Sequence, residues 1–431
     1  MSHHSSQYPY THSVSEATDP AYALWIRYYR HTGEEVDRQA AINNFRIVLD
    51  SDRASVSDSR VAGELLLFAH AKDAEWTSAY QTARKTVHLL SFLAHDSLDN
   101  HDKQYFLTNE MSPLASDAAA LAVMAGENVY GAIELLELGR GVIMNALNAR
   151  RLDLSSLLEE RPSLAQEFVT LRDQLYALHQ SPLENIDQRH EISDRFEQSI
   201  INIRKLKGFD HFLRTHSKSD MHAFAQRGPV VIVNASSYQC DAFIIDKTNT
   251  YIVPIPQLRF SCINERITKL EHLDSDLLEW LWDTIAVHVL NKLGVSQKPQ
   301  DDYMPRIWWV LAGPLSKFPI HAAGYHKQNS AQTVLDRVIS SYDSSVAMLI
   351  YSQQGCNQVD KPKETGKAVI VGIKDLFHVA EEIENVKDIC VSMKLDIMTP
   401  LPRRKDIQSA VDRCTIFHFA GHGRINSLDP L

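Results

Sequence analysis

The change of hydrophobic period near Gly228-Pro229 is the feature that most limits the folds open to this chain. Before it, apolar residues recur at intervals of three and four with few β-branched runs, which is typical of amphipathic helices. After it, short runs of β-branched and aromatic residues alternate with helical stretches. The sequence therefore predicts an all-α region followed by an α/β domain, whose mainly parallel sheet is flanked by helices on both faces.

Four segments follow from this reading of the 431 residues. Residues 1–20 are rich in Ser, His, Tyr and Thr and lack the apolar core of a signal peptide, so we expect a disordered leader. Residues 21–180 form the helical region, and residues 181–227 are predicted to be a long bridging helix. Residues 228–431 form the α/β domain. Both main regions are long enough to bury a core of their own.

The helical region carries a recurring pattern of small and apolar residues. Trp25, Ala41 and Phe45 stand at the offsets of the packing residues in a tetratricopeptide-like hairpin. Two later units place similar residues on one predicted helical face: Trp76, Ala79 and Ala83, then Ala132, Leu136 and Gly139. The spacing between units is irregular. We predict a degenerate helical-repeat array that binds a protein or peptide partner, with an ordinary all-helical domain of chance spacing as the alternative.

The predicted elements can be stated by residue range. Long amphipathic helices are expected over 155–180 and 184–214. Predicted strands cover 230–233, 242–245, 251–253, 306–311, 368–372, 395–398 and 415–419, and predicted helices cover 274–293, 333–338, 379–393 and 405–412. The first three strands are expected to form a meander, and the later alternation predicts parallel βαβ units. In such sheets functional groups collect at the carboxyl ends of the strands.

Composition excludes several classes of partner. The net charge of −10 argues against binding to polyanions, and the densest basic run, Arg403-Arg404-Lys405, is expected to be a solvated loop or helix start. We therefore expect no direct contact with nucleic acid. No run of 18 apolar residues exists, so no membrane span is expected. The five cysteines include no C-x-x-C pair, which argues against a disulfide framework or zinc ribbon and favours a reducing, cytoplasmic setting.

The segment His418-Phe-Ala-Gly-His-Gly423 carries the clearest candidate chemistry. It ends a predicted core strand, and its two glycines indicate a sharp turn around His422. An imidazole at the tip of a strand suits a general base that must reach a nucleophile. The spacing of His418 and His422 would also suit a metal pair on a helix, but the flanks are strand-like and no metal site is expected. We expect His418 to be a packed or hydrogen-bonded strand residue, and His321 to shape a turn.

Five blocks in order extend this pattern: Gly228-Pro-Val-Val-Ile-Val-Asn-Ala-Ser-Ser-Tyr-Gln-Cys-Asp-Ala242, Gly313-Pro-Leu-Ser-Lys-Phe-Pro-Ile-His-Ala-Ala-Gly324, Val338-Ile-Ser-Ser-Tyr342, Val379-Ala-Glu-Glu-Ile383 and His418-Phe-Ala-Gly-His-Gly423. Together they resemble the CHAT family, a caspase-like domain found behind tetratricopeptide repeats, in the form common among fungal proteins. The resemblance covers about residues 21 to 431. It is loose in the helical region and close from Gly228 onward.

The resemblance implies a caspase-like fold and a clan of cysteine peptidases with a His–Cys dyad. The family's histidine matches His422, the general base, and the backbone N–H of Gly423 could stabilise an oxyanion. The family's cysteine lies at the end of the next strand, beyond Leu431, so this chain holds no nucleophile. No cofactor is implied. We expect incidental or buried thiols at all five cysteines: Cys240, Cys262, Cys356, Cys390 and Cys414.

Two hypotheses about function follow. In the first, the chain belongs to a CHAT domain-containing, cysteine-peptidase-like protein of the caspase and separase clan, truncated before its nucleophile and inactive alone. A protein would be the substrate of the full-length form. In the second, the chain is a catalytically inactive binding scaffold that acts through its helical repeats. The two differ in what the coding sequence holds after Leu431.

Overall fold

The computed structural model describes most of the chain after the predicted leader, residues 1–20, which lies outside the described residues. The described ranges are 25–28, 33–51, 54, 56–93, 112–148, 157–158, 160–180, 186–207, 209, 212, 216–267, 270, 274–299, 304–328, 331–350, 352, 366–373, 378–411 and 414–421. The chain divides into two compact units, Met1–Ile350 and Tyr351–Leu431.

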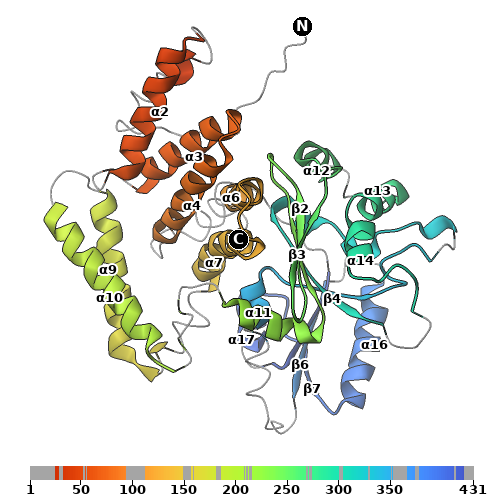
Figure 1. Cartoon of the computed structure of the whole chain (residues 1–431). Coiled ribbons are helices and arrows are strands. Elements are labelled where there is room, and N and C mark those ends of the chain that lie inside the picture. The colour runs from red at the N-terminus through yellow and green to blue at the C-terminus, as the bar shows by residue number, and fades with distance from the viewer. Residues whose placement is uncertain are drawn as a thin grey trace. The chain divides into compact units, whose positions relative to one another are not determined.

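The first unit begins with helices that pack in chain order (Figure 1). They are α2 (Glu35–Asp50), α3 (Val56–Lys72), α4 (Trp76–Leu93), α6 (Ser112–Met124), α7 (Val129–Asn148), α9 (Pro162–Gln180), α10 (Ile186–Arg204) and α11 (Lys218–Phe224). α2 packs on α3, α3 on α4, α4 on α6 and α6 on α7, while α9 pairs with α10. This chain of neighbours is the packing expected of a helical array.

The boundaries of α9 and α10 differ from the predicted ones for physical reasons. α9 begins at Pro162, because proline suits the first position of a helix, and residues 157, 158 and 160 before it are also helical. α10 ends at Arg204 rather than at residue 214. After it, Phe209 and Phe212 join the same core as Phe168 of α9, and Arg204 Nε donates to the Phe212 carbonyl at 2.8 Å. The chain therefore bends back on α9 instead of continuing as a helix.

The predicted packing residues of the first hairpin lie in one core. Trp25, Ala41 and Phe45 are fully buried, and the Trp25 and Phe45 rings meet edge to face with centroids 5.9 Å apart. Such a ring pair contributes about 0.5–1.5 kcal/mol beyond its buried area. Small residues mark later helix crossings, since a Cβ on Gly139 of α7 would overlap that of Ala115 in α6. The helices therefore approach closely where their side chains are smallest.

A five-stranded sheet follows in the same unit. Its strands are β1 (Val230–Asn234), β2 (Asp241–Ile245), β3 (Thr250–Pro254), β4 (Arg306–Leu311) and β5 (Ile339–Tyr342). The order is β3-β2-β1-β4-β5, with β1, β2 and β3 antiparallel and with β4 and β5 parallel to β1. The predicted meander is thus confirmed. β1 and β2 are buried at every position, which explains their uninterrupted apolar runs.

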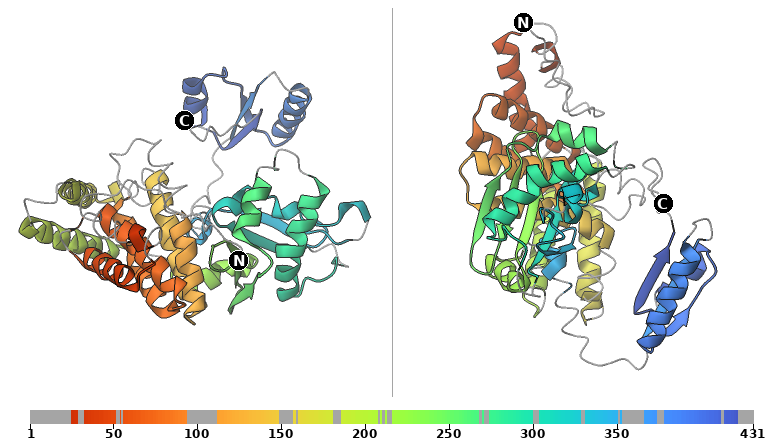
Figure 2. Two further views of the ribbon diagram at one scale, coloured as in Figure 1. Left: turned by 90° about the horizontal axis from the view of Figure 1, so that it is seen from above. Right: turned by 90° about the vertical axis from the view of Figure 1, so that its right-hand side faces the viewer.

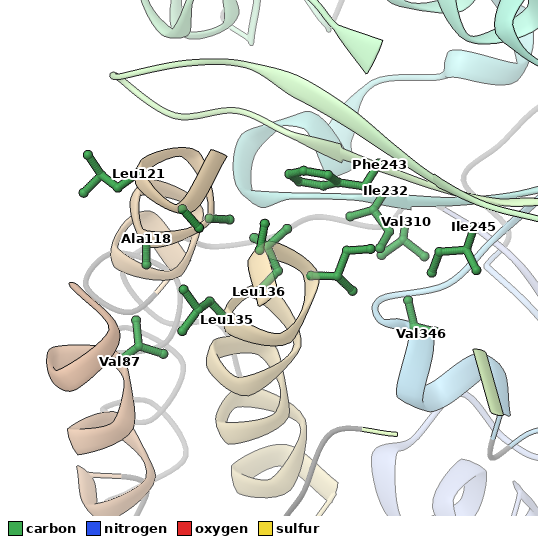
Figure 3. Close-up of a cluster of buried hydrophobic side chains, with 14 of the residues drawn as sticks. Val87, Ala118, Leu121, Leu135, Leu136, Ile232, Phe243, Ile245, Val310 and Val346 are labelled. Atoms are coloured by element: carbon green, nitrogen blue, oxygen red, sulfur yellow. The ribbon is translucent and has the colours of Figure 1, made fainter. Parts of the chain in front are cut away.

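Helices cover both faces of this sheet, and the helices on one face belong to the N-terminal helical region (Figures 1 and 3). On one face, Ile232, Phe243 and Val310 share a core with Ala118 of α6 and Leu136 of α7. The opposite face packs against α12 (Phe260–Ile267), α13 (Ser275–Leu281) and α14 (Val287–Lys292). The core of the first unit therefore extends across the change of period at Gly228.

The predicted helix over 274–293 is present but contains an unpredicted π segment, Trp282–Ala286, between α13 and α14. Asp274 caps its start, because Oδ1 accepts a hydrogen bond from Leu277 N at 2.9 Å. Gly294 ends it with a φ of +74°, a left-handed conformation that favours glycine. π segments are frequent at functional sites, and Trp282 is the first residue of this one.

The helix predicted over 333–338 is wrong, because these residues form turns. Thr333 is held in an isolated bridge to Gly324, and its Oγ1 accepts a hydrogen bond from Asp336 N at 3.1 Å. That single turn cannot propagate, since Ile339 N already donates to the Pro305 carbonyl at 2.9 Å to begin β5. Sheet pairing decides the conformation of a segment too short to form a stable helix.

The second unit is a small parallel α/β layer structure (Figure 2). It comprises β6 (Lys367–Gly372), α16 (Val379–Ser392), β7 (Asp396–Met398), α17 (Arg404–Val411) and β8 (Ile416–Ala420). The strand order is β7-β6-β8, with all pairs parallel. α16 packs on the face of Ile370 and α17 on the face of Val369. The predicted alternation of strands and helices is confirmed, although the strands divide between two sheets.

Candidate functional site

The two residues to which the sequence assigns chemistry, His422 and Gly423, lie outside the described residues. The description of the second unit ends at Gly421, directly after β8. The geometry of the predicted site therefore comes from the strand that precedes it. Figure 2 shows the short sheet to which this strand belongs.

β8 runs parallel to β6, with Ile370 opposite His418 and Gly372 opposite Ala420. The pairing continues past the strand, because Ile373 N donates to the Ala420 carbonyl at 2.9 Å. Both strands therefore end at the same edge of the sheet, their carboxyl edge. In parallel α/β sheets this edge is where ligands and reacting groups usually lie.

Two glycines allow close packing at this edge. A Cβ on Gly372 would overlap Ile383 of α16, so a side chain there would push the helix away from β6. A Cβ on Gly421 would lie 2.8 Å from the Phe419 ring and 3.2 Å from Ile373 Cδ1. Gly421 belongs to the His418–Gly423 motif and Gly372 ends β6, so both strands end in a small residue that allows close packing at this edge.

His418 is held by a carboxylate of α16. Its Nε2 lies 2.9 Å from Glu382 Oε1, across the face of the sheet that α16 covers. The hydrogen bond engages one ring nitrogen of the imidazole. His418 is therefore a hydrogen-bonded strand residue, as predicted.

Three of the described cysteines, Cys240, Cys390 and Cys414, lie in positions that do not suit a nucleophile of the predicted site. Burial, with the charges of Asp241 and Asp117 adding to it, raises the pKa of the Cys240 thiol to about 11, against a weaker opposite effect of its contact with the Ser236 carbonyl. A nucleophilic cysteine needs a lowered pKa instead. In the second unit, Cys390 packs against Ala368 at the start of β6, and Cys414 precedes β8, so both lie away from the carboxyl edge. Cys356 is outside the described residues.

A second polar group occupies the carboxyl edge of the sheet in the first unit. The Tyr342 hydroxyl, at the end of β5, accepts a hydrogen bond from His321 N at 2.7 Å and lies 2.9 Å from His321 Nδ1. Burial raises the pKa of Tyr342 to about 12, against the effect of the hydrogen bond from His321 N, so the hydroxyl keeps its proton. His321 shapes a turn, as predicted, with Tyr342 as the partner that the sequence did not identify.

Sequence reasoning missed a buried polar network after β1. Asn234 Nδ2 donates to the Ser116 carbonyl of α6 at 2.9 Å, and Ser236 Oγ donates to Asp117 Oδ1 at 2.5 Å. Asn234 lies opposite Asp241 in the β1–β2 pair, and both are fully buried. Asn234 Oδ1 has no partner. Polar residues directly after an apolar strand were the available signal, but only the tertiary structure shows that a helix covers them.

The described ranges contain neither a metal-binding cluster nor a membrane-spanning helix. No three His, Cys, Asp or Glu side chains among those residues come together in a way that would hold a metal ion. Within the same ranges, no helix combines the length and the apolar character needed to cross a membrane. Comparison of the chain with protein-family models finds no match, and comparison with curated proteins finds none either.

Proposed function

We propose that this chain carries the histidine half of a cysteine-peptidase-like site of the CHAT type. In this proposal His422 is the general base and the N–H of Gly423 stabilises the oxyanion. The observation that supports it is the parallel pairing of β8 with β6, since the His418–Gly423 motif begins in a strand that ends at the carboxyl edge of a parallel sheet. That edge is the usual position of reacting groups in such sheets.

The position of β8 in its sheet also supports the proposal. β8 is the last strand in the order β7-β6-β8, so in the described part of the unit one side of β8 is an edge. A following parallel strand could pair there, and its carboxyl end would lie at the same edge of the sheet as the end of β8. The resemblance implies the nucleophilic cysteine at that point. A thiol and an imidazole on adjacent strand ends can reach hydrogen-bond distance.

The proposal includes partners and setting. A protein or peptide binds to the helical region, and a protein is the substrate of the full-length form. A caspase-like fold for the α/β part and a cytoplasmic location belong to the same proposal. The location rests on the absence of C-x-x-C spacing, and the described cysteines are free thiols.

The coding sequence after the codon for Leu431 tests the proposal directly. The expected result is an open frame that encodes a further strand with a cysteine at its end. A stop codon followed by unrelated sequence would overturn it. The alternative, an inactive scaffold that binds through its helices, would then account for the chain.

An activity test uses a full-length form with that cysteine. His422→Ala should abolish peptide hydrolysis, and His418→Ala, whose ring is engaged by Glu382, should retain most of it. The 431-residue chain alone should hydrolyse no peptide, because an imidazole without a thiol activates only water, and poorly. Equal activity of the His422→Ala variant and the parent would contradict the assignment.

A further inference from the structure

Arg337 in the first unit is a buried cation with an unusual environment. It lies in the turn that leads into β5, and 7% of its surface is exposed. Its guanidinium stacks over the ring of Trp282, with Cζ 4.6 Å from the ring centroid. Trp282 begins the π segment between α13 and α14. The stack orients the guanidinium plane but neutralises none of its charge.

The guanidinium has no carboxylate partner within the described ranges. Its Nε donates to the Ala331 carbonyl at 3.4 Å, a long hydrogen bond. Neither terminal nitrogen has an acceptor there, and neither is among the fully buried unsatisfied side-chain atoms, so both reach solvent. Burial lowers the pKa of Arg337, against the effect of the nearby Asp336 charge. A desolvated charge without a partner is costly.

The other arginines that are buried among the described residues differ in this respect. Arg38 pairs with the carboxylates of Glu35 and Asp73, and Arg60 pairs with Glu64 at 2.5 Å. Each of these cations is therefore compensated inside the protein. Arg337 alone among the three keeps its terminal nitrogens available.

The nearest acid is already engaged. Asp336 accepts a hydrogen bond from Thr333 Oγ1 at 2.6 Å and lies 3.7 Å from Lys298 Nζ. Arg337 and Lys298 carry two positive charges and Asp336 one negative charge, so the three side chains together keep a net charge of about +1. A monoanion fits that balance better than a phosphate dianion, which the Asp336 carboxylate would repel.

We propose that Arg337, oriented by Trp282, binds the carboxylate of an acidic side chain in a peptide. The two terminal nitrogens form the free edge of the guanidinium and match the two oxygens of a carboxylate. The planar stack pre-orients that edge, so little side-chain entropy is lost on binding. This site is independent of the cysteine-peptidase proposal, since it uses no residue of the second unit.

Binding is tested with the full chain and two blocked tetrapeptides that differ only in Glu or Gln at one position. Titration is followed by calorimetry at constant ionic strength, with chloride as the background anion and inorganic phosphate as a separate arm. The Glu peptide should bind saturably and at least about tenfold more tightly than the Gln peptide. Arg337→Gln should remove this preference, because it removes the charge and the fork, that is, the pair of terminal guanidinium nitrogens that match the two carboxylate oxygens.

Arg266→Gln is the matched control, because Arg266 stacks over Trp280 in the same way, 4.4 Å from the ring centroid. That variant should keep the preference for Glu. Arg337→Lys retains the charge without the fork and serves where the Gln variant does not fold; it should reduce the preference. Equal binding of the two peptides by the parent protein would overturn the proposal, as would phosphate binding without carboxylate binding.

Discussion

Two strands of similar composition have opposite surroundings in the two units. β1 (Val230–Asn234) is buried at every position, whereas in β8 (Ile416–Ala420) Ile416, Phe417 and Phe419 are 36%, 45% and 42% exposed. β1 has β2 and β4 as neighbours and helices over both faces. β8 has only β6 beside it in the described part of its sheet.

The difference shows that an apolar strand sequence predicts a strand but does not predict its burial. Burial depends on how many strands flank it and on which helices reach its faces. In the first unit, one face of the sheet packs against α6 and α7, which precede the sheet by about a hundred residues. In the second unit, α16 and α17 cover the two faces of the sheet. The four predictions below test how far this contrast in packing extends to stability.

The largest effect is expected for Phe243→Ala in β2. Phe243 is fully buried between the sheet and the helical region, so its loss should cost roughly 3–5 kcal/mol of unfolding free energy. Phe419→Ala in β8 is the matched control and should cost less than about 1 kcal/mol. Regional hydrogen exchange on the full chain measures both. Equal losses would contradict the contrast between the two strands.

A smaller effect is expected at a helix crossing of the first unit. Gly139→Ala should destabilise by roughly 1–3 kcal/mol, because the new Cβ would overlap Ala115. Gly131, in the same helix, has only Asn128 Oδ1 within 4 Å, at 3.8 Å from an added Cβ. Gly131→Ala should therefore be neutral or stabilise by about 0.5–1 kcal/mol. Urea unfolding should separate the two variants, and similar shifts would mean that the helices do not pack this closely.

The β2–β3 hairpin should show opposite pH dependences at two aspartates. Burial raises the pKa of Asp241, against the hydrogen bond from Gln239, so its stabilising contribution is complete below the unfolded-state pKa and is lost as pH rises through the folded-state pKa. Asp241→Asn should remove this loss and be relatively more stable at pH 7 than at pH 4. Its amide could also donate to the unpaired Asn234 Oδ1.

Asp246→Asn is the control for that experiment. Despite some burial, backbone N–H groups of Thr248 and Asn249 lower the pKa of Asp246, so its contribution is present above the unfolded-state pKa and lost as pH falls. The Asn variant should lose stability at pH 7 relative to pH 4. Unfolding midpoints at the two pH values provide the measurement. The same sign of change for both variants would refute the assignment.

The smallest effect is expected for His418→Ala in the second unit. The hydrogen bond between His418 and Glu382 is partly exposed, so its loss should cost less than about 1 kcal/mol. Glu382→Gln, which keeps the shape of the side chain, should cost no more than His418→Ala. Hydrogen exchange of β6 and β8 amides reports the result. A loss as large as that of Phe243→Ala would mean that this polar pair, rather than packing, holds the second unit together.

Much of the secondary structure followed from sequence alone. The residues of β4 match the predicted strand at both ends, and the ends of the strands and helices after residue 366 differ from the predicted ones by at most one residue. Local signals suffice there, because the apolar period, the capping residue Asp274 and the terminal Gly294 act over one or two turns. They fail at 333–338, where the pairing of Ile339 with a distant strand decides the conformation.

The candidate site residues likewise divide into those that the sequence could identify and those that only the tertiary structure shows. The motif around His422 could be found in the sequence because it is a contiguous run after a strand. By contrast, the contacts between His321 and Tyr342, Asn234 and Ser116, and Arg337 and Trp282 join residues 21 to 118 positions apart. No local pattern marks such pairs, because each depends on which strands are neighbours.

The sequence by itself determined the order of elements, the switch from helices to alternating strands and helices, and the strand that precedes His422. Only the tertiary structure decided that the described strands form two sheets, that early helices cover the first sheet, and that Arg337 is buried with no paired carboxylate among the described residues. The physical reason is the separation along the chain over which each interaction acts. Backbone periodicity and capping act between near neighbours along the chain, whereas burial and charge compensation depend on residues that meet only after folding.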